Sequence, residues 1–201
     1  MKLIARLGDT RRANCYLLGP DGGGDSVFID PAAFDTAVLE RIERYGLDIR
    51  AVLLTHAHAG HFAGLRTILK LYEPVVYSYL PNVGDITTSP VREGSRIEIG
   101  CFSFHVIETP GHTDDSIVYR TGNLLFTGDT LSAGQIGQTS SAVLQRMLLS
   151  SVREKILSLP GELMILPGHG PPSTVAIERE LNPYLTDSPD ESGEDPSTET
   201  S

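Results

Sequence analysis

The chain has 201 residues, of which 40% are hydrophobic, and its 16 basic and 26 acidic side chains give a formal net charge of −10. This length supports one substantial core, and the acidic balance excludes the basic face that a nucleic-acid partner requires. The two cysteines are widely separated, so no disulfide is expected. The sequence has no apolar run long enough to cross a bilayer, and its N-terminus turns polar too early for a signal peptide. We therefore predict a cytoplasmic protein without a membrane partner.

The N-terminal third alternates strand-like and helix-like patterns. Three short runs rich in branched or aromatic residues, separated by turn-forming segments, predict an antiparallel meander over residues 1–6, 14–19 and 26–30. Apolar residues then recur at helical spacing, at Val38, Leu39, Ile42 and Tyr45. Gly46 follows as a natural C-terminal stop, so this segment is expected to form an amphipathic helix.

A nearly continuous apolar run over residues 49–55 predicts a strand covered on both faces. A second helical pattern follows at Leu65, Ile68, Leu69 and Tyr72. The intervening segment, "HAHAGH", therefore lies in a turn between a strand and a helix, where α/β folds place ligand sites.

The remainder of the chain continues the α/β alternation. Five further strands are expected at residues 74–78, 95–100, 102–109, 116–120 and 123–127. They are followed by a helix over 143–157, a strand over 162–166 and a helix over 174–181. Residues 186–201 contain six acids, no base and no large apolar residue, which predicts a disordered acidic tail after a single domain over 1–185. Without the tail the formal charge is about −4.

Five of the six histidines stand in turns that follow apolar runs, namely His56, His58, His61, His112 and His169. Asp129 occupies the same kind of position. Neutral imidazoles with a carboxylate are the ligand set of zinc, iron or manganese at an open catalytic site. His105 lies within an alternating strand pattern and is interpreted as structural.

Four motifs, "THAHAGH", "TPGHT", "FTGDT" and "LPGHGP", together with the early "NCYLLG" and "FIDP", resemble the metallo-β-lactamase superfamily and especially its small glyoxalase II-like hydrolases. The resemblance implies a four-layer αββα sandwich with metals at one edge between two sheets. It also implies that His56, His58 and His112 hold one metal and that Asp129 bridges to a second, held by His61 and His169. A metal-bound water, which loses its proton near neutral pH, would then attack the substrate.

Gly60 departs from the family pattern, because the resemblance places an aspartate ligand of the second metal at this position. Without that aspartate, two divalent cations would face a charge of about −2 instead of −3. We therefore expect one firmly bound Zn²⁺ at the three-histidine site, with Asp129 as a fourth ligand or as the group that orients the water, and a weak second site. Asp114 or Asp115 could replace the missing ligand, although an aspartate after Thr113 is expected to cap a turn.

The predicted function is the hydrolysis of a small-molecule ester, thioester or lactone. The short region after His169 leaves no room for the glutathione-gripping domain of glyoxalase II enzymes, and Gln138 stands where relatives commonly have arginine. One alternative is a persulfide dioxygenase-like enzyme with a single Fe²⁺ on His56, His112 and Asp129. The other is a non-catalytic descendant that retains a metal or only the fold. The oligomeric state stays open.

Overall fold

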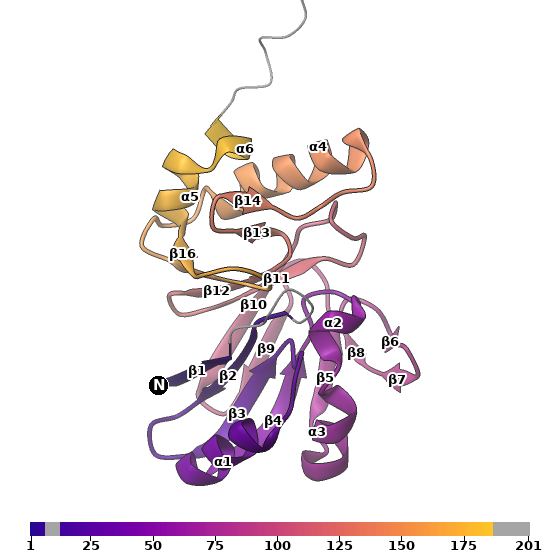
Figure 1. Cartoon of the computed structure of the whole chain (residues 1–201), viewed down its shortest axis with the longest axis vertical. Helices are drawn as coiled ribbons and strands as arrows, with labels where there is room; N and C mark the ends of the chain where they lie inside the picture. Colours follow the sequence, from indigo (N-terminus) through magenta and orange to yellow (C-terminus); the bar gives the residue numbers. More distant parts are fainter. Residues whose placement is uncertain (7–12, 187–201) are drawn as a thin grey trace, which may run out of the picture.

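The computed structural model describes residues 1–6 and 13–186. Two six-stranded sheets face one another, and helices cover the outer side of each sheet (Figure 1). This arrangement confirms the predicted α/β class and the four-layer αββα sandwich.

The first sheet is built from the N-terminal half of the chain. Its order is β1 (Lys2–Arg6), β2 (Cys15–Gly19), β3 (Gly24–Ile29), β4 (Leu47–Leu53), β5 (Val75–Ser78) and β8 (Ser89–Pro90). The first three strands form the predicted antiparallel meander, whereas β3, β4, β5 and β8 pair in parallel. The outer face of this sheet is covered by α1 (Thr36–Tyr45) and α3 (Leu65–Tyr72).

The second sheet is built from the C-terminal half. Its order is β16 (Ser173–Thr174), β15 (Met164–Pro167), β12 (Leu124–Gly128), β11 (Ile117–Thr121), β10 (Phe102–Glu108) and β9 (Arg96–Ile99). All pairs are antiparallel except β12 with β15. The covering elements are α4 (Ala142–Ser151), the π-helix η1 (Val152–Ile156), α5 (Val175–Leu181) and α6 (Pro183–Thr186).

Three clusters of buried apolar side chains lie between these layers. The central cluster fills the space between the sheets, where alternate residues of β10 such as Phe104 and Val106 meet Tyr16 and Leu18 of β2. A second cluster packs α1 and α3 onto the first sheet, and a third packs α4, η1 and α5 onto the second. The clusters explain why β4 is continuously apolar from Ala51 to Leu53, since this end of the strand is covered on both faces, whereas Asp48 and Arg50 lie nearer its start.

The longer predicted elements are confirmed, including the helix that ends at Gly46, which adopts the left-handed conformation with φ of 60°. The prediction of a single helix over 143–157 is wrong. The chain widens into a π-turn at Val152, where Leu157 N donates to Val152 O. Short elements were missed: α6, β16, β8 and the hairpins β6 (Asn82–Val83) with β7 (Ile86–Thr87) and β13 (Leu131–Ser132) with β14 (Gln135–Ile136).

Neither cysteine forms a disulfide within the described residues; Cys15 is buried and Cys101 is exposed. Among the described residues, no helix is both long enough and apolar enough to cross a membrane. The predicted acidic tail lies outside the described residues except for Thr186, which ends α6.

Candidate metal centre

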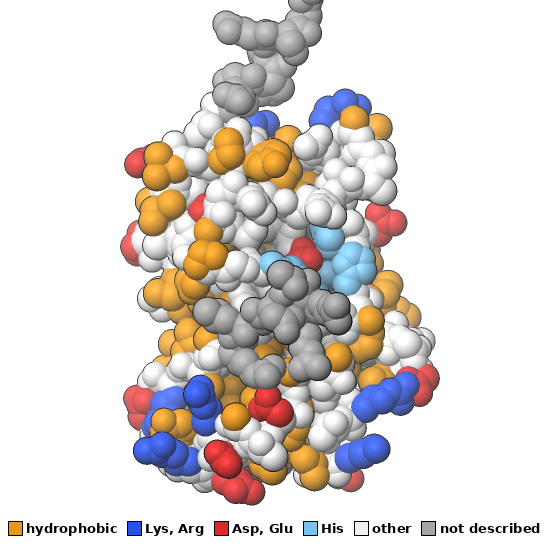
Figure 2. Space-filling model, viewed as in Figure 1, with side chains coloured by type: hydrophobic (Ala, Val, Ile, Leu, Met, Phe, Trp, Pro, Cys, Tyr) orange, Lys and Arg blue, Asp and Glu red, His pale blue; other side chains and the backbone are white. Residues whose placement is uncertain are grey.

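Six side chains gather at one edge of the sandwich, and each comes from a loop or turn that follows a strand. The segment after β4, including the one-turn helix α2 (Ala59–Phe62), carries His56, His58 and His61. The loops after β10, β12 and β15 carry His112, Asp129 and His169. Pale-blue histidine atoms lie around a red acidic side chain on the face shown in Figure 2, while His56 and His61 themselves are buried. Strands of both sheets therefore contribute to one centre.

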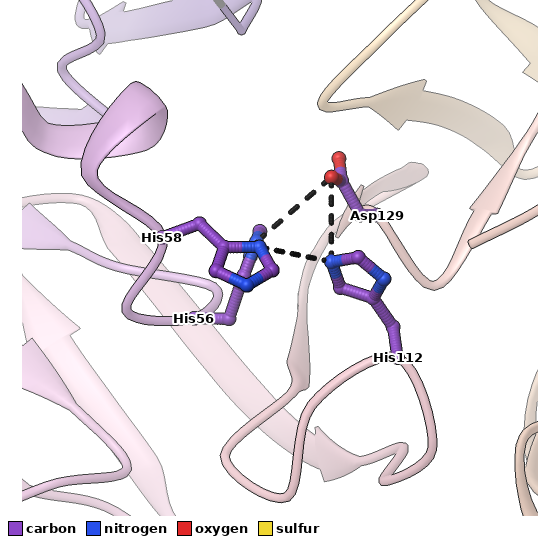
Figure 3. A group of neighbouring side chains, drawn as sticks. All are labelled: His56, His58, His112 and Asp129. Carbon is purple, nitrogen blue, oxygen red and sulfur yellow. Dashed lines mark hydrogen bonds and ion pairs between the residues drawn. The ribbon is translucent and has the colours of Figure 1, made fainter. Parts of the chain in front are cut away.

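The first group contains His56, His58, His112 and Asp129, whose potential ligand atoms all lie within 4.8 Å of one another. His58 Nδ1 is 3.0 Å from His56 Nε2 and 3.1 Å from His112 Nε2. Asp129 Oδ2 is 3.5 Å from His112 Nε2 and 3.9 Å from His56 Nε2. The four side chains point toward one another (Figure 3). A neutral imidazole carries one N–H, so these nitrogens cannot all satisfy one another, whereas a shared cation can satisfy them together.

The second group contains His61, Asp129 and His169. His61 Nε2 lies 3.3 Å from Asp129 Oδ1, and His169 Nε2 lies 3.8 Å from Asp129 Oδ2. His61 Nε2 and Asp129 Oδ1 are both buried without a hydrogen-bond partner among the described residues. Two buried polar atoms that face one another unsatisfied fit a cation between them. His169 is more exposed, at 49%, so its ligand atom is less firmly positioned.

Asp30, at the end of β3, sets the proton positions on two of the histidines. Its Oδ2 accepts from His61 Nδ1 at 2.9 Å and from the Thr55 hydroxyl at 2.6 Å, while Oδ1 accepts from Thr55 N at 2.8 Å. Because the Thr55 proton is directed to Asp30, Thr55 Oγ1 is free to accept from His56 Nδ1, 3.1 Å away. His56 thus carries its proton on Nδ1 and presents the Nε2 lone pair to the first group, whereas His61, whose Nδ1 proton is held by Asp30, presents an Nε2 lone pair to the second group only when a bound cation displaces the Nε2 proton.

The other loops are fixed by backbone carbonyls. His112 Nδ1 donates to Gln138 O at 2.7 Å, which again leaves Nε2 free for a cation. The loop that carries His169 is held by Asn14, whose Nδ2 donates to Pro167 O at 3.0 Å and to Gly170 O at 2.8 Å. The Tyr16 hydroxyl also donates to Pro167 O, at 2.7 Å. Asn14 and Tyr16, both in the "NCYLLG" motif, therefore support the loop that carries His169.

Two glycines allow the loops to approach this closely. A Cβ at Gly168 would overlap Asp129 Oδ1 and come within 2.5 Å of His61 Cε1. A Cβ at Gly137 would overlap Asp129 O and lie 3.0 Å from His112 Cβ. Neither glycine has a positive φ, so the requirement at both positions is space.

The electrostatics differ between the two groups. Burial, reinforced by the neighbouring His61, lowers the pKa of His56 to about 2, and burial also lowers the pKa of His58. Both therefore stay neutral and able to bind a cation. Burial opposes protonation of His61 as well, but Asp30 and Asp129 outweigh it and raise the pKa to about 10. For Asp129, burial is outweighed by His61, His56 and His169, which hold its pKa below the usual range.

Gly60 lies inside α2 and does not have a positive φ. Among the described residues, Asp129 is the one carboxylate in the second group, and neither Asp114 nor Asp115 belongs to either group. The expectation that these acids cap the turn is corrected by the structure. Ser116 closes the turn instead, because its Oγ accepts from Thr113 N and pairs with Thr113 Oγ1. The hydroxyl side chains satisfy the turn without a carboxylate.

The structure places the remaining sequence features as follows. His105 lies outside both groups, on β10, where it pairs with Arg120 of β11 and Arg96 of β9. Asp30 was missed as a site residue, although it follows the apolar end of a strand as the selected histidines do. That shared position at a strand exit is the signal that could have identified it.

Residues 8–169 match the profile of the metallo-beta-lactamase superfamily. The chain belongs to this superfamily of metallo-hydrolases. It is 30% identical to the probable metallo-hydrolase YqgX of Bacillus subtilis, over 87% of this chain and 92% of that protein. It is 28% identical to the hydroxyacylglutathione hydrolase GloC of Haemophilus influenzae, over 86% of this chain and 92% of that one. The crystal structure of ETHE1 from Myxococcus xanthus superposes with a TM-score of 0.84 at 28% identity, covering 94% of this chain and 86% of ETHE1.

Proposed function

We propose that this chain is a metal-dependent hydrolase of a small ester, thioester or lactone. The observation that carries the proposal is the first group, in which three histidines and an ionised aspartate converge from three separate loops. The metallo-hydrolase and hydroxyacylglutathione hydrolase names of two relatives support the same reaction class.

His56, His58 and His112 would hold one cation, with Asp129 as the fourth ligand. A divalent cation bound there would polarise the substrate carbonyl. It would also supply a bound water that ionises near neutral pH. Asp129, held ionised by its histidine neighbours, is positioned to accept a hydrogen bond from that water and to orient it. A cavity of about 420 Å³ beside His112, Asp129 and His169 gives the substrate access to these groups.

We propose Zn²⁺ as the firmly bound cation and a weaker second site at His61, Asp129 and His169. The weakness follows from Gly60, because the second group has a single carboxylate that it shares with the first. A first-group cation with Asp129 and a hydroxide is already neutral, so a second cation gains little electrostatic stabilisation.

A mononuclear Fe²⁺ dioxygenase is the second candidate, favoured by 34% identity to the human persulfide dioxygenase ETHE1 over 85% of this chain and 70% of that protein. Such a centre would use His56, His112 and Asp129 and keep other positions open. His58 favours the hydrolase instead, because its Nδ1 lies 3.0 Å from His56 Nε2 and 3.1 Å from His112 Nε2 and so offers a third imidazole ligand.

Metal analysis of protein purified without added metal, combined with a thioester hydrolysis assay, separates these functions. About one zinc per chain with hydrolysis supports the proposal, whereas iron with substrate-dependent oxygen uptake supports the dioxygenase. A folded, metal-free and inactive chain would indicate a non-catalytic descendant. His112→Ala should abolish activity and most metal binding, while the control His105→Ala, outside both groups, should preserve them.

A further inference from the structure

Two hollows join beside the metal centre. The first, of about 420 Å³, opens from His112, Asp129 and His169, and the second, of about 500 Å³, reaches α4 and Tyr184 of α6. They share Ile136, Gly137 and Gln138 in their walls, and we treat the two neighbouring hollows together as one groove that leads away from the metal centre. In Figure 2 mostly white and orange atoms lie above the histidines toward the C-terminal helices.

The lining of this groove is polar but uncharged beyond the candidate metal ligands. Its side chains include Ser132, Gln135 and Gln138 near the centre and Ser140, Gln145 and Tyr184 farther out. No lysine, arginine or glutamate lines either hollow among the described residues. Each glutamine offers two N–H donors and one carbonyl acceptor, and no side-chain hydrogen bond engages Gln135, Gln138 or Gln145 within the described part of the chain.

Neither Arg146 nor Arg153 lines the groove. Arg146 follows Gln145 on α4 but is absent from the groove wall, and Arg153 donates to the backbone carbonyl of Tyr184 at 3.4 Å from η1. A carboxylate that enters the groove would lose hydration without gaining an opposite charge from the side chains of the groove walls. An amide or hydroxyl group would instead exchange water for glutamine and hydroxyl partners.

We propose that the groove binds the leaving alcohol or thiol of the substrate and selects one that is neutral and carries amide or hydroxyl groups, against one that carries a carboxylate. This inference rests on the proposed hydrolase function. The leaving group is the portion assigned to the groove because it must depart from the metal centre, and the groove is the route that opens there.

Paired thioesters test the selection. The acetyl thioesters of N-acetylcysteamine and of 3-mercaptopropionate are similar in length, but only the second carries a carboxylate. After correction for their rates of hydroxide hydrolysis, kcat/KM should be at least about tenfold higher for the neutral thioester, which corresponds to about 1.4 kcal/mol. Gln145→Lys should narrow that ratio by raising the value for the anionic thioester. Val143→Lys adds the same charge on the exposed side of α4, at a residue 57% exposed, and should leave the ratio unchanged.

A binding measurement separates the groove from the chemistry. The uncleavable thioethers N-acetyl-S-methylcysteamine and 3-(methylthio)propionate can be titrated into the metal-loaded protein by calorimetry, and the neutral thioether should bind more tightly. If the neutral thioether binds more tightly but neither thioester is hydrolysed, the selectivity of the groove is supported and the proposed hydrolase function is refuted. Hydrolysis of both thioesters at equal corrected rates, or equal binding of both thioethers, would overturn the selection.

Discussion

Asp30 illustrates how one buried carboxylate can serve two metal groups. It accepts from His61 directly and from His56 through the Thr55 hydroxyl, and no other described side chain contacts both histidines in this way. Partners of this kind fix the tautomer of a ligating histidine and raise its basicity, and their loss typically lowers metal affinity by about 10- to 100-fold.

Asp30→Asn should therefore weaken metal binding without removing any candidate ligand. The amide retains one acceptor oxygen but loses the charge and the second acceptor, so Thr55 N, the Thr55 hydroxyl and His61 Nδ1 can no longer all be satisfied. Chelator competition on protein shown to be folded by circular dichroism measures the expected loss of about 10- to 100-fold. Asp25→Asn removes a carboxylate that is 46% exposed and pairs with Arg50, and it serves as the control. Wild-type affinity in Asp30→Asn would refute this role.

Gly60→Asp should strengthen the second metal site. The substitution adds a carboxylate beside His61, and the helical conformation of Gly60 in α2 presents no left-handed barrier to aspartate. Each 1.4 kcal/mol gained is a tenfold change in the binding constant, so zinc titration with bound metal counted per chain should show a clear rise in the second equivalent. Ala59→Asp adds the same charge one position earlier on α2 and should change the stoichiometry less. Two equally tight equivalents in the wild type would show that the second site needs no further anion.

At the scale of elements, the ends of β12 and β15 must touch for the centre to form. Gly168 N donates to Gly128 O at 2.7 Å, which brings Asp129 and His169 side by side. Gly168→Ala should force Asp129 and His61 apart, because its Cβ would occupy their space. We expect reduced metal occupancy and a fall in activity of at least about tenfold, since small misplacements of reacting groups are costly. Gly22→Ala, where an added Cβ meets nothing within 4 Å, is the matched control, and equal behaviour of the two variants would contradict the steric argument.

The long elements could be predicted because their hydrophobic periodicity and stop signals are local. The helix from Thr36 to Tyr45 is an example, since Gly46 ends it with its own backbone conformation. The hairpins β6–β7 and β13–β14 could not be predicted from the sequence, because two-residue strands have no measurable hydrophobic period. The six candidate ligands followed from the repeated strand-exit positions, and their division into two groups followed from the resemblance to the metallo-β-lactamase superfamily. Asp30 did not, because its role depends on contacts with Thr55 and His61, which are distant in sequence. The neutral groove likewise arises only when β13–β14, α4 and α6 are packed together.

At the scale of the whole molecule, the centre links the two sheets. His56 and His58 follow β4 of the first sheet, whereas His112 and Asp129 follow β10 and β12 of the second. A cation bound to all four should stabilise the folded state, because the unfolded chain does not hold these groups together. Removing metal with a chelator should lower the melting temperature, and restoring zinc at about a thousandfold over Kd should recover about 4 kcal/mol. Calorimetry should detect this shift in wild type and in His105→Ala but not in His112→Ala. A melting temperature that is insensitive to zinc in wild type would argue against occupancy of the first group.

The boundary between the domain and the acidic tail can be placed by two truncations. Leu185 of α6 is 8% exposed and packs into the cluster beneath the second sheet with Val118 and Leu125, and the Thr186 hydroxyl donates to Asn182 O. A chain ending at Thr186 keeps these contacts and loses only residues 187–201, whose six acids and lack of large apolar side chains give them little to bury. Its melting temperature and hydrolytic activity should therefore match those of the full chain within about 2 °C and about twofold, respectively.

A chain ending at Asn182 loses Leu185, and removal of a buried leucine costs about 2–5 kcal/mol, so its melting temperature should fall by roughly 4–15 °C. Leu185→Ala in the full chain should reproduce most of that fall, because the lost packing and not the shorter length is responsible. A large fall in the chain that ends at Thr186 would instead mean that the acidic segment docks on the domain, and the boundary would then lie beyond α6.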